Sequence, residues 1–304
     1  MVDFKTLIDL QITIFCLLLA GYILTKAGVL SLDARKPLSA LLINFVLPCN
    51  IFSSFMIEFN MQILKDCLAI LIVSVCAQIF AVVISRFIYP GSTREQLAVL
   101  RYGTVVSNAG FMGNPVAYGL FGTQGLLYAS FYQIPLRIFM WSAGLACFTG
   151  TKGEHVLRKV LTHPCIIAIF LGMIRMVFQI PLPSGLTKAI TYSSNCTTAL
   201  SMLTIGNILA GVDLKTTFSL KGLWYCLVRL LLIPGLVFFG CMLFQVEPLV
   251  RSVSVVLAGM PAAATTAILA ANYDCDDVFA AKIVFMSTLL SLVTVPVLCL
   301  LFAA

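Results

Sequence analysis

Long apolar stretches, each bounded by charged or turn-forming residues, divide this chain from end to end. A helix of roughly 20 apolar residues is long enough to cross the hydrocarbon core of a bilayer. The ten stretches cover residues 7–25, 36–57, 66–88, 96–120, 124–148, 158–179, 185–210, 219–244, 249–272 and 278–302. The pattern predicts an all-α polytopic membrane protein with ten transmembrane helices, joined by short loops such as the one from Glu58 to Asp66.

Composition supports a membrane protein and narrows the classes of function. Hydrophobic residues make up 61% of the 304 positions and charged residues only 10%, whereas soluble domains are roughly a quarter charged. No connecting segment is long enough for a soluble signalling domain, which argues against a receptor or sensor. The net charge of +7 is therefore read as a property of the loops, and no nucleic-acid partner is expected.

The basic residues of the loops predict how the chain is oriented. Twelve of them follow the first, third, fifth, seventh and ninth stretches, and four lie on the opposite side. The twelve are Lys26, Arg35, Lys36, Arg86, Arg94, Arg101, Lys152, Arg158, Lys159, Lys215, Lys221 and Lys282, and the four are Lys5, Lys65, Lys188 and Arg251. Because positively charged loops stay on the cytoplasmic side, both termini are predicted to lie outside the cell (plasma) membrane.

The sequence shows neither a metal site nor a catalytic set. The eleven cysteines are scattered without a C-x-x-C pair, and most lie in apolar stretches, where Cys behaves as a small hydrophobic residue. His155 and His163 lie at or near a basic loop and are expected to cap a helix or line an interface. A membrane-embedded enzyme needs a Ser/His pair, paired Asp residues or a His-rich metal set at one depth. We therefore expect no enzymatic activity, no cofactor and no metal.

The stretch from Val105 to Gly122, VVSNAGFMGNPVAYGLFG, is apolar enough to span a membrane but is interrupted at its centre. Pro115 cannot donate a helical hydrogen bond and disfavours helical geometry at Asn114, and Gly110 loosens the backbone further. In hydrocarbon such a break persists only where it lines a cavity or packs against protein. It is either a helix broken at a substrate site or a simple proline kink.

A related motif in the second half of the chain favours the broken helix. Ala109 to Met112 (AGFM) precedes Pro115, and Ala258 to Pro261 (AGMP) ends in a proline. Five predicted spans separate the two motifs, so they cross the membrane in opposite directions. Paired breaks in corresponding spans of two halves are the best sequence indication of a transporter binding site. The predicted halves are residues 1–150 and 151–304.

Four stretches resemble the auxin efflux carrier family, which includes bacterial permeases and the plant PIN carriers. They are FVLPCNIFSSF (45–55), NAGFMGNPVAYGLFG (108–122), QIPLRIFMWSAG (133–144) and MPAAATTAILAANYDCDDVFAAKIVFMSTLLSLVTVP (260–296). The second and fourth are the most specific, and the resemblance covers nearly the whole chain. The short loops look more like those of the bacterial members than those of the long plant carriers.

The resemblance implies a 5+5 inverted-repeat fold in which the broken helices of spans 4 and 9 cross. Spans 1, 2, 6 and 7 would form a scaffold, and spans 3–5 and 8–10 a transport domain that moves as an elevator. Family substrates are small organic anions, such as malate, malonate or auxin-like acids. Bacterial relatives often place an Asn a few residues after the proline of span 9, where this chain has Thr265 and Thr266, so the polar contact at these positions departs from the family pattern.

The residues around the two breaks indicate how an anion would bind. The half-helices expected after Pro115 and Pro261 begin near the midplane, where their free N–H groups and partial positive charge suit a carboxylate. The carbonyl ends before the breaks are candidates to receive a cation. Asn108 and Asn114 either bind the ligand or satisfy the local backbone.

Arg137 lies near the middle of the fifth span, one turn from Gln133. A guanidinium inside a membrane is costly and faces a partner or a water-filled cavity, so Arg137 either binds the carboxylate or pairs with an internal group such as a helix C-terminus. Arg175 and Arg229 are placed closer to span ends, from which their side chains can reach the membrane surface.

Asn50, together with Pro48 and Asn44, forms a further polar interruption in span 2. It is either the scaffold wall of the site or a kink with a capped backbone.

No acidic residue falls at a predicted span centre, which favours a uniporter, or coupling through backbone carbonyls or the substrate's own proton. The nearest alternative is a Na⁺-coupled bile-acid-type organic anion symporter, which would need a polar cation cage near the crossing. Span 9, with Ala262, Ala263 and Ala264, is poor in such ligands. The expected partners are a small organic anion, the lipid bilayer and, in a homodimer, a second copy of the chain.

Overall fold

The computed structural model describes residues 4–149, 158, 161–211, 219–273 and 275–302, and over these residues the chain is helical and forms no β-strand. The first half contains α1 (Phe4–Lys26), a 3₁₀ turn η1 (Leu32–Ala34), α2 (Arg35–Leu41), η2 (Leu42–Val46), α3 (Leu47–Ser54), α4 (Met61–Ser85), α5 (Arg94–Val105), η3 (Ala109–Gly113), α6 (Asn114–Phe139), η4 (Met140–Gly144) and α7 (Leu145–Thr149). The second half contains α9 (Pro164–Phe178), α10 (Ser184–Ala210), α11 (Leu220–Leu227), η6 (Val228–Leu232), α12 (Ile233–Leu243), α13 (Pro248–Ala258), α14 (Thr265–Asn272) and α15 (Asp277–Phe302). The segments η2, η3, η4 and η6 are π-helical turns.

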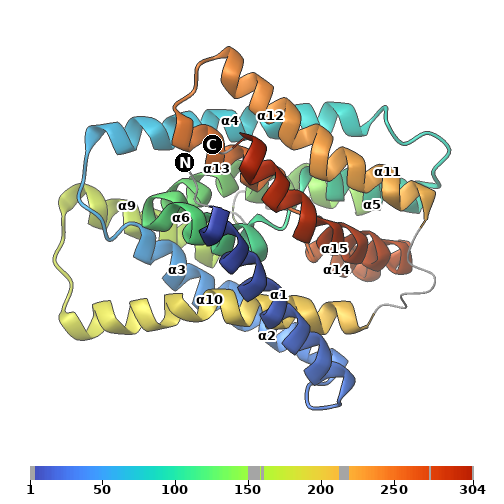
Figure 1. The fold of residues 1–304 in the computed structure, drawn as a ribbon, viewed down its shortest axis with the longest axis horizontal. Helices are drawn as coiled ribbons and strands as arrows, with labels where there is room; N and C mark the ends of the chain where they lie inside the picture. Colours follow the sequence, from blue (N-terminus) through green and yellow to red (C-terminus); the bar gives the residue numbers. More distant parts are fainter. Residues whose placement is uncertain (1–3, 150–157, 159–160, 212–218, 274, 303–304) are drawn as a thin grey trace.

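Several helical segments are long and apolar enough to cross a membrane. They are Leu32–Ser54, Met61–Ser85, Leu220–Leu243 and Asp277–Leu301, with shorter apolar helices at Ile12–Lys26, Pro164–Phe178 and Pro248–Ala258. In Figure 1, α4 and α12 lie along one edge of the molecule and α10 along the opposite edge, with α6 between them. The all-helical class predicted from the sequence is confirmed, and these helices agree with a polytopic membrane protein.

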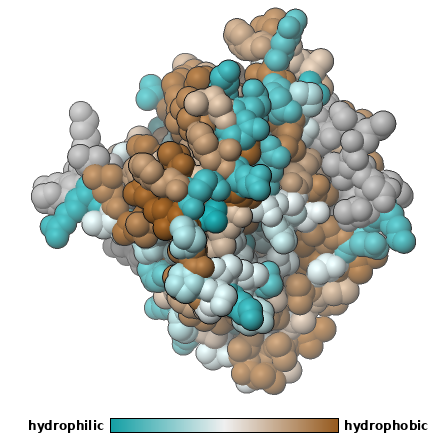
Figure 2. Space-filling view, turned by 90° about the vertical axis from the view of Figure 1, so that its left-hand side faces the viewer, coloured by the Kyte–Doolittle hydropathy of each residue, from teal (hydrophilic) through white to brown (hydrophobic). Residues whose placement is uncertain are grey.

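The end of the molecule at which α10 begins exposes both hydrophilic and hydrophobic residues (Figure 2). Figure 2 shows this face, with hydrophilic and intermediate residues across its middle and hydrophobic residues gathered towards its periphery. Such a distribution is expected where the end of a helical bundle meets water and its sides meet lipid.

The predicted loop from Glu58 to Asp66 is too long. Asn60 begins α4 earlier, because its side chain accepts a hydrogen bond from the Gln62 amide at 2.7 Å and so caps the helix. Asp66 lies in the second turn of α4, where it is buried and accepts hydrogen bonds from the Tyr128 hydroxyl (2.7 Å) and from Gln62 Nε2 (2.8 Å). An acidic side chain placed in a loop from the sequence is thus buried inside a helix.

Three prolines follow π-helical turns at the same spacing. Pro48, Pro115 and Pro234 are each the second residue after η2, η3 and η6 respectively. A proline ring collides with the carbonyl four residues earlier in a regular α-helix. In all three cases that carbonyl lies inside the π turn, whose wider hydrogen-bond spacing leaves room for the ring. The helices therefore continue through these prolines.

Glycines allow α1 and α10 to pack with their backbones in contact, and Figure 1 shows α1 crossing over α10. A Cβ atom on Gly206 would collide with the Leu18 carbonyl oxygen and lie 2.7 Å from the Tyr22 amide nitrogen. One on Gly21 would collide with the carbonyl oxygen of Leu203. Small residues at a helix crossing permit close packing of this kind in membranes.

Gly206→Ala is expected to lower the free energy of unfolding by about 1–3 kcal/mol, because the added methyl group forces α1 and α10 apart. Thermal unfolding of the detergent-purified protein measures the effect. Gly240→Ala is the matched control, since nothing lies within 4 Å of a Cβ at that position of α12 and alanine favours a helix over glycine. Equal melting temperatures for the two variants would show that the crossing tolerates a side chain.

Candidate functional site

Two extended segments from opposite halves of the chain meet inside the protein. α5 ends at Val105 and α13 at Ala258, and the residues after each helix leave helical geometry. Ser107 and Ala262 form an antiparallel bridge, in which the Asn108 amide donates to the Pro261 carbonyl at 2.8 Å. The Ala263 amide donates to the Val106 carbonyl at 3.2 Å. Each interruption therefore supplies hydrogen-bond partners that the other lacks.

The first interruption lies earlier in the chain than the sequence predicts. Asn114 is helical, with φ −62° and ψ −49°, and Pro115 is in the first turn of α6. The backbone leaves the helix at Val106 and re-enters it at Ala109, so Pro115 does not mark the break. The prediction is wrong at this point because the π turn before Pro115 leaves room for the proline ring, so the helix continues through it.

A cavity of about 380 Å³ lies beside the paired segments. On one side it is lined by Asn108, Gly110 and Phe111, at the N-terminal end of the helix formed by η3 and α6. On another it is lined by the N-terminal end of α14, from Ala263 to Thr265. The first amides are unpaired within a helix, so both ends present N–H groups and partial positive charge to the cavity.

Arg137 places a guanidinium on the wall of this cavity. The side chain is 7% exposed, and its Nη2 donates to Gln133 Oε1 at 3.0 Å. Gln133 Nε2 donates in turn to Asn114 Oδ1 at 2.6 Å and to the Ala129 carbonyl at 3.1 Å. Arg137 Nε has no partner, and none of the described residues that line the cavity is acidic. The cavity therefore has a positive wall that its own side chains do not neutralise.

The remaining predicted residues lie around this cavity in different ways. Thr265 lines it and shares a 3.1 Å hydrogen bond with the Tyr102 hydroxyl. Thr266 is fully buried, and its hydroxyl has no partner among the described residues. Pro261 contributes its carbonyl to the paired segments. His163 caps α9, as predicted, by accepting a hydrogen bond from the Cys165 amide at 3.3 Å, while His155 lies outside the described residues.

Asn50 and Pro115 line a second, smaller cavity of about 200 Å³ between α3, α6 and α10. Asn114 also lines it, and through its bond to Gln133 it connects this cavity with the first one. Asn50 Nδ2 donates to Ser194 Oγ at 3.0 Å, whereas Asn50 Oδ1 and Asn114 Nδ2 are buried without partners. Eight of the ten predicted site residues thus line one or other of two neighbouring cavities, while Pro261 and Thr266 line neither.

Arg229 differs from its expected position near a span end. It does not extend to the membrane surface: the side chain is 3% exposed and lies in η6. Its Nη1 donates to the Thr104 carbonyl at 3.0 Å and its Nε to the Met260 carbonyl at 3.1 Å. These carbonyls belong to the C-terminal end of α5 and the residues just after α13, where partial negative charge accumulates.

Two features of the sequence indicate that Arg229 is buried. It lies near the middle of the stretch 219–244, so its expected place near a span end was wrong, and Pro234 follows five residues later, where in this chain a π turn precedes a proline. Arg229 therefore donates to carbonyls at the ends of α5 and α13, where the sequence analysis placed candidate cation ligands.

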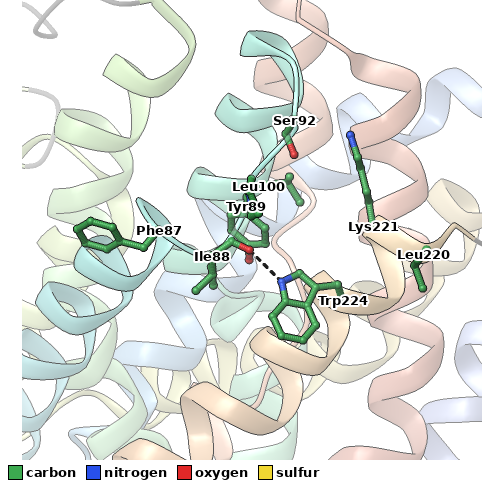
Figure 3. Close-up of a pocket in the computed structure, with 9 residues that line it drawn as sticks. Phe87, Ile88, Tyr89, Ser92, Leu100, Leu220, Lys221 and Trp224 are labelled. Atoms are coloured by element: carbon green, nitrogen blue, oxygen red, sulfur yellow. Dashed lines mark hydrogen bonds between the residues drawn. The ribbon is translucent and has the colours of Figure 1, made fainter.

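A further cavity of about 410 Å³ lies at the turn between α4 and α5 (Figure 3). The Trp224 indole N–H donates to the Ile88 carbonyl at 2.9 Å, as the dashed line in Figure 3 marks. Lys221 Nζ donates to the Gly91 carbonyl (2.9 Å) and to Gln96 Oε1 (3.2 Å). The amine and the indole are both paired with protein, so they fasten α11 to the turn.

The described chain is an all-helical bundle of apolar segments with a cavity beside its two interruptions, which agrees with a polytopic membrane protein. The chain belongs to the membrane transport protein family, the auxin efflux carrier family, whose sequence model matches residues 6–155 and 148–299. It is 29% identical over 293 residues to an uncharacterized transporter of Methanothermobacter thermautotrophicus, covering 94% of this chain and 95% of the relative. It is 27% identical over 303 residues to the uncharacterized transporter MJ1031 of Methanocaldococcus jannaschii, covering 94% and 96%.

The family resemblance seen in the sequence is confirmed by these matches. A membrane transporter is not a class of enzyme, which agrees with the absence of a catalytic set in the sequence.

Proposed function

We propose that this protein is a secondary transporter that moves small organic anions, carboxylates of the malate, malonate or auxin-like kind, across the cell membrane. The observation that carries the proposal is the 380 Å³ cavity, in which two helix N-termini and the Arg137 guanidinium meet without an acidic side chain among the described lining residues. Helix N-termini and arginine are the groups that proteins use to bind carboxylates. A cavity of this volume is in the range for small ligands.

Transport requires that the cavity face each side of the membrane in turn. In the proposed arrangement, two inverted five-helix repeats place broken helices at the crossing, and an elevator-like domain carries the cavity past a scaffold. The scaffold would comprise α1–α3, α9 and α10, and the hydrogen bond between Asn50 and Ser194 joins two of its helices. Asn108, Gln133 and Arg137 all lie on the other, mobile part.

Arg229 argues against the alternative of a Na⁺-coupled bile-acid-type symporter. The backbone carbonyls near the crossing are the natural ligands for a coupling cation in this architecture. Arg229 already donates to Thr104 and Met260, and its fixed charge would repel a second cation. This observation favours a uniporter, or coupling through the substrate's own proton.

Uptake of radiolabelled malate, malonate and an aromatic carboxylate into proteoliposomes tests the proposal. We expect saturable uptake of at least one anion, and equal rates when Na⁺ in the buffer is replaced by K⁺ or choline. Uptake that requires a Na⁺ gradient would support the symporter instead. Failure of folded protein to transport any of the three anions would count against an organic anion carrier.

A further inference from the structure

A separate cavity of about 660 Å³ lies between the end of α4, α5 and the turns that follow α6. Its lining residues are Val82, Ser85, Arg86, Arg101, Val105, Phe139, Ser142, Ala143, Ala146 and Cys147, and none of them lines the proposed anion cavity. Most of the wall formed by described residues is therefore apolar, and its charged members among them are the two arginines. The smaller cavity in Figure 3 differs in that its basic side chain, Lys221, is hydrogen-bonded to protein groups.

The two arginines lack counter-ions within the described part of the chain. Arg86 directly follows α4 and is exposed, and Arg101 is half-buried on α5. Neither forms an ion pair or a side-chain hydrogen bond with another described residue, and Arg101 Nε is buried without a partner. Two positive charges beside apolar walls repel one another and favour an anion between them.

The serines of the cavity do not compete for that anion. Ser85 Oγ donates to the Val82 carbonyl at 2.8 Å, and Ser142 Oγ is bonded in the same way to the Ile138 carbonyl at 2.6 Å. Because both hydroxyl hydrogens point at backbone carbonyls, recognition rests on the guanidinium groups. A ligand is then selected by its negative charge and by the apolar part that fills the rest of the cavity.

The depth of the cavity points to the lipid headgroup region. Phe87, the residue after Arg86, is 77% exposed, and Trp224 of the adjoining α11 is half exposed (Figure 3). Aromatic side chains of this kind gather at the boundary between hydrocarbon and water. Arg86 at the end of α4 and Arg101 on α5 lie on the side to which the sequence assigns most of the basic residues, which the positive-inside rule places at the cytoplasmic leaflet.

We propose that this cavity binds one anionic phospholipid. The phosphate lies between Arg86 and Arg101, and an acyl chain runs along Val82, Val105 and Phe139. A basic pocket between transmembrane helices on the cytoplasmic side is suited to such a headgroup, and arginine binds phosphate through paired N–H groups. A free anion would leave the apolar walls uncovered, so the lipid is the better occupant.

Native mass spectrometry of the delipidated full-length protein, titrated with phosphatidylglycerol or phosphatidylcholine, tests the proposal. We expect one tight phosphatidylglycerol site, and a weakening of roughly 30-fold in the double variant R86Q/R101Q, since two surface cations each strengthen lipid binding by about fivefold. The double variant R35Q/K36Q removes the same charge from exposed positions of α2 and is expected to change the affinity by less than about threefold.

Three results would overturn the proposal, provided that all variants elute as the same folded species. These are equal affinity of the wild type and R86Q/R101Q for phosphatidylglycerol, equal binding of the two lipids by the wild type, and displacement of the lipid by glycerol 3-phosphate at comparable concentration. The last result would identify a free-anion site. None of these measurements depends on transport, so failure of the proposed function would leave the test intact.

Discussion

Replacing Arg229 by methionine is expected to lower the free energy of unfolding by about 2–6 kcal/mol. Methionine keeps much of the side-chain length but leaves the carbonyls of Thr104 and Met260 buried without donors, and each unpaired buried acceptor costs about 1–3 kcal/mol. The loss also removes the positive charge that faces the C-terminal ends of two helices. Thermal or denaturant unfolding in detergent measures the effect.

Arg94→Met controls for the removal of an arginine, because Arg94 is exposed at the start of α5. It is expected to change the free energy of unfolding by less than about 1 kcal/mol. Arg229→Lys keeps the positive charge but lacks the planar guanidinium whose separate N–H groups donate to the two carbonyls. Its free energy of unfolding should lie between those of the wild type and the methionine variant. A methionine variant as stable as Arg94→Met would show that Arg229 does not hold the crossing together.

Arg137→Ala is expected to weaken binding of the transported anion by roughly 10- to 150-fold, the range for losing a hydrogen bond to a charged group. Arg137 is the charged side chain on the wall of the 380 Å³ cavity, and Gln133 holds it in place. The measurement is the dissociation constant of the anion identified by proteoliposome uptake. Binding is measured on protein that elutes and melts as a folded species, so that loss of folding is not mistaken for loss of the site.

Arg175→Ala is the matched control for this experiment. Arg175 lies in α9, where it donates to the carbonyls of Phe55 and Ile57 at 3.3 Å, and it does not line the cavity. Its removal should leave the affinity for the anion unchanged. If Arg137→Ala also binds the anion with wild-type affinity, Arg137 belongs to the structural support of the cavity and not to the site.

Most of the apolar stretches contain helices, because length and hydropathy are local properties of the chain. The helix ends were less predictable. Asn60 starts α4 before the apolar run begins, and Asp66 is then stabilised by a hydroxyl 62 residues further along the chain. That contact between α4 and α6 cannot be seen in the sequence around Asp66.

The breaks illustrate the same limit. The rule that proline ends a helix is sound for a regular α-helix, but the π turn before Pro115 removes the collision and moves the break to Val106. The bridge between Ser107 and Ala262 is a long-range pairing that no local pattern specifies. Glycine and proline residues predict that both segments depart from a regular helix. The position of each interruption depends on the contact between the two segments.

The structure places most of the predicted site residues around two cavities, a grouping that the sequence does not show. Asn108, Gly110 and Thr265 line one cavity with Gln133 and Arg137. Asn50, Asn114 and Pro115 line the smaller cavity of about 200 Å³. The contacts of the buried Arg229 are not evident from the sequence, because the carbonyls that accept its hydrogen bonds belong to residues 125 and 31 positions away.

The pairing of the two extended segments has a consequence for how the protein can be divided. Val106 and Asn108 come from the first half of the chain, and their hydrogen-bond partners Pro261 and Ala263 from the second. Either half expressed as a separate polypeptide would carry unpaired backbone groups at the depth of the bilayer, where water is scarce. We therefore expect neither half to fold correctly without the other. The 380 Å³ cavity, which residues of both halves line, then forms only when both are inserted in the membrane and packed together.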